Sequence, residues 1–264
     1  MSVIHANDQN LAEVMLGRHA RRIYAEGDSW FSSGGIFNGS LLDAIARIRP
    51  TWLIVSSAYP GAELSEMNDV SSGEYQWMLM PTDGMPPWDA LLISGGGNDL
   101  LKHAGDMVDA DGLLVSRVHA SLQKITSDMD DMVRKARLAQ RNLPVFINCY
   151  DFPWPIASDS PWIPGPWMGP DFIDAGLPAM RWHEVAMEMV NALHAAFYDV
   201  ACHHENVYLV DGRGILSRPA QRWLKPMLSD WANEIHPSAR GYDKHAKRWA
   251  SIIDYHTAPA GALN

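Results

Sequence analysis

Residues 24–31 read Tyr24-Ala25-Glu26-Gly27-Asp28-Ser29-Trp30-Phe31, and the fold prediction starts from this stretch. A strand is predicted over residues 22–25, and the glycine after it permits a sharp backbone turn. Ser29 then lies at the carboxyl end of a strand, where open α/β sheets bind their ligands. A Gly-Asp-Ser triplet is also typical of an ordinary turn or helix cap. Ser29 is therefore a candidate nucleophile that needs partners elsewhere in the chain.

Three further stretches supply such partners in a fixed order. They are Tyr59-Pro60-Gly61-Ala62, Gly95-Gly96-Gly97-Asn98-Asp99 and Asn233-Glu234-Ile235-His236-Pro237. With the first stretch they resemble the SGNH (GDSL-like) hydrolases, a family named for a serine, a glycine, an asparagine and a histidine in four blocks. The matching residues are Ser29, Gly61, Asn98 and His236. The blocks span nearly the whole chain, so the resemblance covers a domain.

Strands and helices are predicted to alternate along the chain. Five apolar runs predict strands, at residues 22–25, 52–57, 90–94, 144–148 and 206–210. Amphipathic patterns predict helices at residues 41–48, in part of 63–80, at 116–141 and 179–200, and from about 239 onward. This alternation favours an α/β fold with a central, mostly parallel five-stranded sheet and helices on both faces. The resemblance implies the same fold, a flavodoxin-like three-layer α/β/α sandwich, as one domain over residues 1–264.

Composition and charge argue against several classes of partner. Of the 264 residues, 47% are hydrophobic and 20% are charged, which is the composition of a globular protein. The net charge of −10, without a run of Lys and Arg, argues against nucleic acid as a partner. We see no signal peptide and no membrane span, so a cytoplasmic location is expected, and secretion without a leader stays open. The sequence does not indicate an oligomeric state.

The connection over residues 151–170 is rich in proline and tryptophan, and we call it the flap. It follows the fourth predicted strand, at the same edge as the other site residues, and its prolines make it stiff and non-helical. Trp154, Trp162 and Trp167 either pack between helices or form a wall of the substrate pocket, and the two interpretations are compatible. With Trp30 they are the candidate substrate-binding residues, for an apolar chain or a sugar ring.

The resemblance implies acyl transfer by a serine nucleophile. Ser29 would attack the ester carbonyl, and His236 would remove the serine proton and hand it to the leaving alcohol. The backbone N–H groups of Ser29 and Gly61 and the side-chain amide of Asn98 would form the oxyanion hole. No metal or cofactor is implied. With a histidine base, activity is expected to fall as the pH drops through about 6 to 7.

One position departs from the family's pattern. The family has Asp three residues before the histidine, and this chain has Asn233. The site could therefore be a Ser-His dyad, in which Asn233 or a main-chain carbonyl fixes the imidazole tautomer. Asp230 could instead be the third member, and Glu234 is a further candidate whose side chain is expected to point elsewhere. The dyad and Asp230 are favoured over Glu234.

Other motifs lack essential parts. Gly95-Gly96-Gly97 is not followed by the Lys and Ser/Thr of a phosphate-binding loop, and His183-Glu184 lacks the second histidine of a zinc-protease helix. The prediction is a serine esterase for a lipid acyl, short acyl or sugar acetyl ester. The alternative is a catalytically weakened protein of the same fold that binds a carbohydrate or a lipid, and Asn233 is the feature that favours it.

Overall fold

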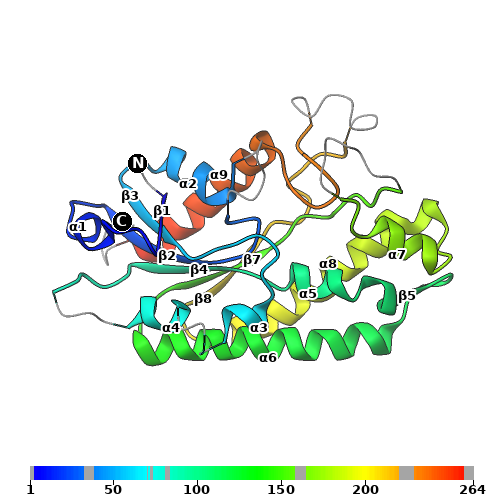
Figure 1. Ribbon diagram of the computed structural model, residues 1–264, viewed down its shortest axis with the longest axis horizontal. Helices are drawn as coiled ribbons and strands as arrows, with labels where there is room; N and C mark the ends of the chain where they lie inside the picture. Colours follow the sequence, from blue (N-terminus) through cyan, green and yellow to red (C-terminus); the bar gives the residue numbers. More distant parts are fainter. Residues whose placement is uncertain are drawn as a thin grey trace.

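The computed structural model describes residues 3–32, 39–69, 71, 74–80, 84–157, 165–219 and 229–258. Its centre is a six-stranded sheet in the order β1-β3-β2-β4-β7-β8 (Figure 1). These strands are β1 (Val3–His5), β2 (Arg21–Gly27), β3 (Trp52–Ser56), β4 (Ala90–Ser94), β7 (Val145–Cys149) and β8 (Val207–Asp211). Every neighbouring pair is parallel, which confirms the predicted parallel sheet.

The sheet has one strand more than the five predicted. The added strand is β1, which pairs with residues 54–56 of β3 at one edge of the sheet. Three residues are too few to show a hydrophobic period, so the sequence carries no strand signal there. A separate antiparallel pair joins β5 (Val108–Asp109) to β6 (Gly112–Leu113).

Helices cover both faces of the sheet, so the predicted three-layer sandwich is confirmed (Figure 1). On one face lie α2 (Leu41–Ile48) and α9 (Ala239–Thr257). On the other lie α3 (Leu64–Met67), α4 (Glu74–Leu79), α6 (Val115–Ala139) and α8 (Trp182–His203). The shorter helices are α1 (Leu11–Met15), α5 (Gly97–Lys102), α7 (Gly169–Asp174) and the 3₁₀ helices η1 (Ala104–Met107) and η2 (Ala179–Arg181).

The sequence pattern explains these layers. All five residues of each of β3, β4 and β7 are buried, as expected for strands covered on both faces. Helix α6 buries a regularly spaced apolar stripe, which includes Val118, Ile125, Met129, Met132 and Ala136. Helix α2 begins with a capping box, in which Ser40 Oγ accepts the Asp43 N–H at 3.1 Å and the Asp43 carboxylate accepts the Ser40 N–H at 2.9 Å.

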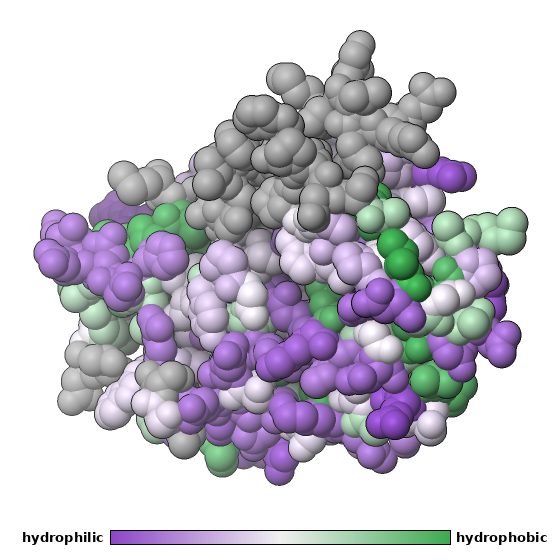
Figure 2. All heavy atoms as spheres, turned by 45° about the vertical axis from the view of Figure 1, so that its right-hand side comes forward, coloured by the Kyte–Doolittle hydropathy of each residue, from purple (hydrophilic) through white to green (hydrophobic). Residues whose placement is uncertain are grey.

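The carboxyl ends of the neighbouring strands β2, β4 and β7 point toward the right in Figure 1, where α5 and α7 lie. Ser29 lies in the turn after β2, Asn98 is the second residue of α5 after β4, and the flap begins after β7. Figure 2 shows this end of the molecule, where hydrophobic residues are scattered among hydrophilic ones. Within the described ranges, no helix combines the length and hydrophobicity needed to cross a membrane.

Candidate active site

Ser29 lies in the turn after β2, and its hydroxyl meets His236. The distance between Ser29 Oγ and His236 Nε2 is 2.7 Å, although the two residues are 207 positions apart. Gly27 makes this turn possible, because a Cβ there would lie 2.8 Å from the carbonyl oxygen of Ser94. The fold thus brings the predicted nucleophile and the predicted base into direct contact.

Asn233 orients the imidazole of His236. Its Oδ1 lies 3.0 Å from His236 Nδ1 and also accepts the backbone N–H groups of Ile235 at 3.1 Å and His236 at 2.8 Å. These two N–H groups require an oxygen at that position, so the imidazole donates from Nδ1. The other ring nitrogen, Nε2, is then free of a proton and accepts the Ser29 hydroxyl, which is the tautomer that a general base needs.

Asp230, a favoured candidate for this role, has other partners. Its carboxylate accepts the Ser217 N–H at 2.8 Å and the Lys244 ammonium at 2.5 Å, and it forms an ion pair with Arg240 at 3.2 Å. The structure therefore does not bring Asp230 to His236, and the interpretation of Asp230 as the third member is not supported. These bonds tie the loop before the histidine to α9.

Glu234 points away from the imidazole, as expected. Its side chain is fully buried and accepts backbone N–H groups from Ile156, Trp167, Met168 and Gly169 of the flap. This contact could not be predicted, because nothing in the sequence pairs position 234 with a loop about 70 residues earlier.

The electrostatics of His236 differ from the expectation. Burial lowers the pKa of His236 to about 4, because the charged imidazolium would lose its hydration and the neighbouring amide of Asn233 supplies no negative charge in return. With this pKa the acid limb of activity is expected near pH 4, below the range of 6 to 7 expected from the sequence.

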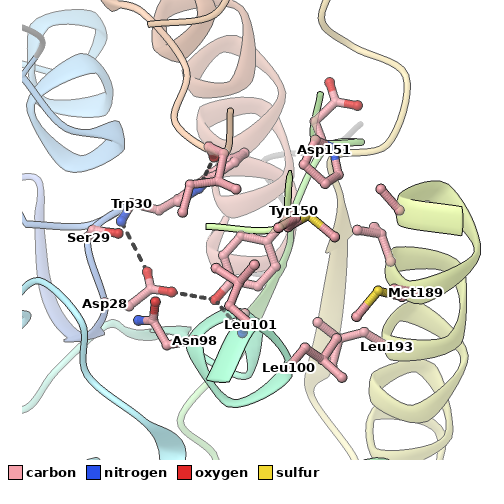
Figure 3. A pocket seen from close by; sticks show the side chains of 16 residues that line it. Asp28, Ser29, Trp30, Asn98, Leu100, Leu101, Tyr150, Asp151, Met189 and Leu193 are labelled. Atoms are coloured by element: carbon pink, nitrogen blue, oxygen red, sulfur yellow. Dashed lines mark hydrogen bonds between the residues drawn. The ribbon is translucent and has the colours of Figure 1, made fainter. Parts of the chain in front are cut away.

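A hydrogen bond joins Asn98 to the loop of Gly61, the two residues predicted with Ser29 to form the oxyanion hole. Asn98 lines the same pocket as Ser29 (Figure 3), and its Nδ2 donates to the carbonyl oxygen of Ala62 at 2.9 Å. That bond uses one of the two amide hydrogens and connects Asn98 to the loop of Gly61. Gly61 has a φ of +81°, a conformation that favours glycine, and no heavy atom lies within 4 Å of the position a Cβ would take.

A buried network of hydrogen bonds around Asp28 holds the turn that carries Ser29. Asp28 accepts hydrogen bonds from the Trp30 N–H at 3.0 Å and the Tyr150 hydroxyl at 2.5 Å (Figure 3). It also accepts the Ser94 hydroxyl at 2.9 Å. Burial raises the pKa of Asp28 to about 6, although these hydrogen bonds act to lower it. Sequence analysis did not identify Ser94 or Tyr150, and the available signal was their position at the ends of predicted strands.

Two of the predicted substrate-binding tryptophans lie at the site. Trp30 lines the pocket but is only 3% exposed, and its Nε1 donates to the carbonyl oxygen of Ile235 at 3.2 Å. Trp167 packs edge-to-face against His236, with 5.5 Å between ring centroids.

The structure assigns Trp154 a packing role. Its ring stacks on His183 with 3.5 Å between centroids, and the Arg218 guanidinium lies 5.1 Å from the ring centroid. Trp154 is thus engaged by protein side chains, and it does not line the pocket beside Ser29. The fourth candidate, Trp162, lies outside the described residues.

An apolar pocket opens beside Ser29 (Figure 3). With its mouth it holds about 550 Å³ of space that protein atoms do not fill. Its apolar lining comes from α5, α8 and the flap and includes Leu100, Leu101, Pro153, Met168, Met189, Val190 and Leu193. Among the residues that the structure describes, no group of three or more His, Cys, Asp and Glu side chains could hold a metal ion.

The model of the GDSL-like lipase/acylhydrolase family matches residues 25–244. The fold is similar to that of a lipase from a goat rumen metagenome, with 14% identity, a TM-score of 0.57, and coverage of 89% of this chain and 98% of that chain. It is also similar to a family 3 carbohydrate esterase from Clostridium thermocellum, with 17% identity, a TM-score of 0.52, and coverage of 91% of this chain and 99% of that chain. A third similar structure is a lipase/acylhydrolase from Enterococcus faecalis, with 16% identity, a TM-score of 0.51, and coverage of 89% of this chain and 96% of that chain. No curated protein matches the sequence.

Proposed function

Because the chain belongs to the GDSL-like lipase/acylhydrolase family and is a hydrolase of ester bonds, we propose that it cleaves a carboxylic ester through an acyl-enzyme on Ser29. The observation that carries this proposal is the 2.7 Å hydrogen bond between Ser29 Oγ and His236 Nε2 at the mouth of an apolar pocket. A hydroxyl bound to a neutral, oriented imidazole is the arrangement that nucleophilic catalysis requires.

The reaction follows from these positions. Ser29 Oγ attacks the ester carbonyl carbon while His236 Nε2 takes the hydroxyl proton, and the carbonyl oxygen becomes an oxyanion. The Asn98 amide and the backbone N–H groups of Ser29 and Gly61 donate to that oxyanion. Collapse of this intermediate breaks the ester bond, and His236 gives its proton to the leaving alcohol. Water then attacks the acyl-enzyme with His236 again as base, which releases the acid and restores the Ser29 hydroxyl.

The amide of Asn233 can support this cycle without a charge. Replacing the triad aspartate by asparagine in a serine protease lowers turnover by about 10⁴, because the amide selects the wrong imidazole tautomer. Here two backbone N–H groups fix Asn233 Oδ1 toward the imidazole, so the tautomer is the productive one. The cost that remains is a less stabilised imidazolium.

The pocket lining favours an apolar acyl chain over a sugar acetyl group. Side chains such as Leu100, Leu101, Met189 and Leu193 offer no hydrogen bonds to sugar hydroxyls, whereas an alkyl chain in contact with them gains about 25 cal/mol per Å² of buried apolar surface. We therefore propose that the acyl part of the substrate is a hydrocarbon chain.

The same pocket would also serve a second candidate function, a lipid-binding protein with little turnover. The observation that favours it is Asn233, since an imidazolium formed during catalysis would have no carboxylate beside it.

Covalent labelling with a fluorophosphonate probe separates the two functions. The wild-type protein should be labelled at Ser29, while Ser29→Ala and His236→Ala should not, with folding checked by circular dichroism. A p-nitrophenyl ester series from acetate to decanoate should be hydrolysed with an optimum above acetate. A folded wild-type protein that neither reacts with the probe nor turns over any ester would refute the esterase and favour the binding protein.

A further inference from the structure

The carboxylate of Glu234 gathers two separate segments of the flap. Its Oε1 accepts the Ile156 N–H at 3.2 Å and the Gly169 N–H at 3.1 Å. Its Oε2 accepts the Trp167 N–H at 2.5 Å and the Met168 N–H at 3.1 Å. One side chain therefore joins residue 156 to residues 167–169.

The backbone of the same residue adds to this contact. The carbonyl oxygen of Glu234 accepts the Trp154 N–H at 2.9 Å. The two flap segments also meet closely, because a Cβ at position 169 would lie 1.6 Å from the carbonyl oxygen of Ile156. Glycine is required there, and the two segments touch beside the carboxylate.

Only an ionised carboxylate satisfies all four N–H groups. Each of its oxygens accepts two hydrogen bonds, and neither has to donate. A glutamine of the same shape accepts with one oxygen and presents an NH₂ group to the other two donors. In either orientation of that amide, two of the four N–H groups lose their acceptor, so Glu234→Gln weakens the attachment of the flap to position 234.

The segments held by Glu234 carry part of the pocket wall. Met168 lines the apolar pocket, and so does Pro153, which directly precedes Trp154. On the other side of Glu234, Ile235 lines the same pocket and His236 binds Ser29. The loop that supplies the base thus also sets the position of the flap.

We propose that Glu234 is a positioning residue that sets acyl-chain selectivity, because it fixes the flap as one wall of the acyl pocket. The inference rests on the proposed esterase function. It assigns Glu234 no contact with the reacting atoms. A long acyl chain reaches the wall that Glu234 holds, while an acetyl group stays at the mouth beside Ser29.

The test measures kcat and KM of Glu234→Gln on p-nitrophenyl acetate and p-nitrophenyl octanoate. We expect kcat/KM for the octanoate to fall about tenfold or more, mainly through KM, since two charge-assisted hydrogen bonds at the wall are lost. The acetate should change by less than about threefold. The matched control is Glu184→Gln, which removes an exposed carboxylate of α8 that pairs with Arg181. It should change kcat/KM for neither ester.

A second variant, Met168→Ala, removes the wall side chain and leaves Glu234 in place. If Glu234 acts through this wall, Met168→Ala also lowers octanoate selectivity, and adding Glu234→Gln to it lowers that selectivity less than Glu234→Gln does alone. Equal losses for both esters in Glu234→Gln, or no loss for either, would overturn the proposal. If Glu234→Gln does not fold, unchanged octanoate selectivity in Met168→Ala overturns it.

Failure of the proposed function has a different signature. A wild-type protein that hydrolyses neither ester refutes the esterase and, with it, the selectivity role. Hydrogen exchange then tests the attachment of the flap to Glu234 alone. The Trp167, Met168 and Gly169 amides should be protected in the wild type and exchange faster in Glu234→Gln. Equal exchange rates in the two proteins would refute this attachment as well.

Discussion

The nucleophile half of the site, residues 26–30, and the base half, residues 229–238, are anchored by different kinds of hydrogen bond. In the nucleophile half, Asp28 accepts two side-chain hydroxyls, from Ser94 and Tyr150, at the ends of neighbouring strands. In the base half, Glu234 accepts four backbone N–H groups from the flap. The nucleophile half is therefore attached to the sheet, whereas the base half is attached to the flap through Glu234 and to α9 through Asp230.

This difference separates chemistry from selectivity. The turn of Ser29 is tied through Asp28 to residues at the ends of β4 and β7. The loop of His236 carries the base and also holds the flap, so changes there can alter which acyl chain fits. The following predictions test how independent the two halves are.

Removing the reacting group of either half should have the largest effect. Ser29→Ala and His236→Ala should each lower kcat by at least about 10⁴ on p-nitrophenyl butyrate, because nucleophile and base act as one unit. The double variant should then lose little more than either single variant. If the loss of kcat in the double variant equalled the product of the losses in the two single variants, Ser29 and His236 would act in separate steps.

Removing a donor that neither half contains should have a smaller effect. Asn98→Ala should lower kcat by about 10² to 10³, because one oxyanion donor is lost while Ser29 and His236 keep their hydrogen bond. The variant should retain fluorophosphonate labelling at a reduced rate and unfold at nearly the wild-type temperature. A folded Asn98→Ala protein with full activity would remove Asn98 from the oxyanion hole.

One carboxyl group from each half, Glu26 and Asp230, should respond to pH in opposite directions. Burial raises the pKa of Glu26 from 4.5 to about 7, so the folded protein keeps a proton that the unfolded chain releases. The stability that the protonated Glu26 contributes to the folded protein is fully present below about pH 4.5 and is lost as the pH rises through 7. For Asp230, burial acts to raise the pKa, but the hydrogen bonds from Lys244 and Ser217 lower it, so its contribution is lost as the pH falls.

Glu26→Gln tests this contrast by removing the titration of Glu26 and leaving that of Asp28 in place. Urea unfolding at pH 5 and at pH 8 should show the variant gaining about 1–3 kcal/mol relative to wild type over that interval, because only the wild type must ionise the buried carboxyl of Glu26. A stability difference between the two proteins that does not change with pH would contradict the buried titration of Glu26.

The smallest effect is expected from a charge placed beside the base. Asn233→Asp puts a carboxylate next to His236 Nδ1, and an adjacent opposite charge raises a histidine pKa by about 1 to 3 units. The acid limb of kcat/KM should move upward from near pH 4 by that amount, so activity at pH 5 falls about tenfold below its plateau. The same acid limb in both proteins would show that position 233 does not set the charge of the base.

Much of the nucleophile half could be predicted from the sequence. Ser29 follows a predicted strand, as do Gly61 and Asn98 outside this half, and the carboxyl ends of parallel strands meet on the same side of a sheet. Even there the sequence did not reveal Tyr150, since its bond to Asp28 depends on how two turns approach each other.

The base half could be predicted only in part. His236 was found from its block, but the choice among Asn233, Asp230 and Glu234 depends on backbone directions inside a loop. The partners of Glu234 lie about 70 residues away, and no periodic pattern encodes them. The lowered pKa of His236 also follows from burial, which the sequence does not give.

The edge-to-face contact between Trp167 and His236 gives the site an optical reporter. A protonated imidazole quenches indole fluorescence more strongly than a neutral one, so the emission of Trp167 should drop as His236 takes up its proton near pH 4. The chain has 11 tryptophans, and the difference between wild type and Trp167→Phe isolates this signal. The protonation of His236 can thus be followed by tryptophan fluorescence, without any substrate.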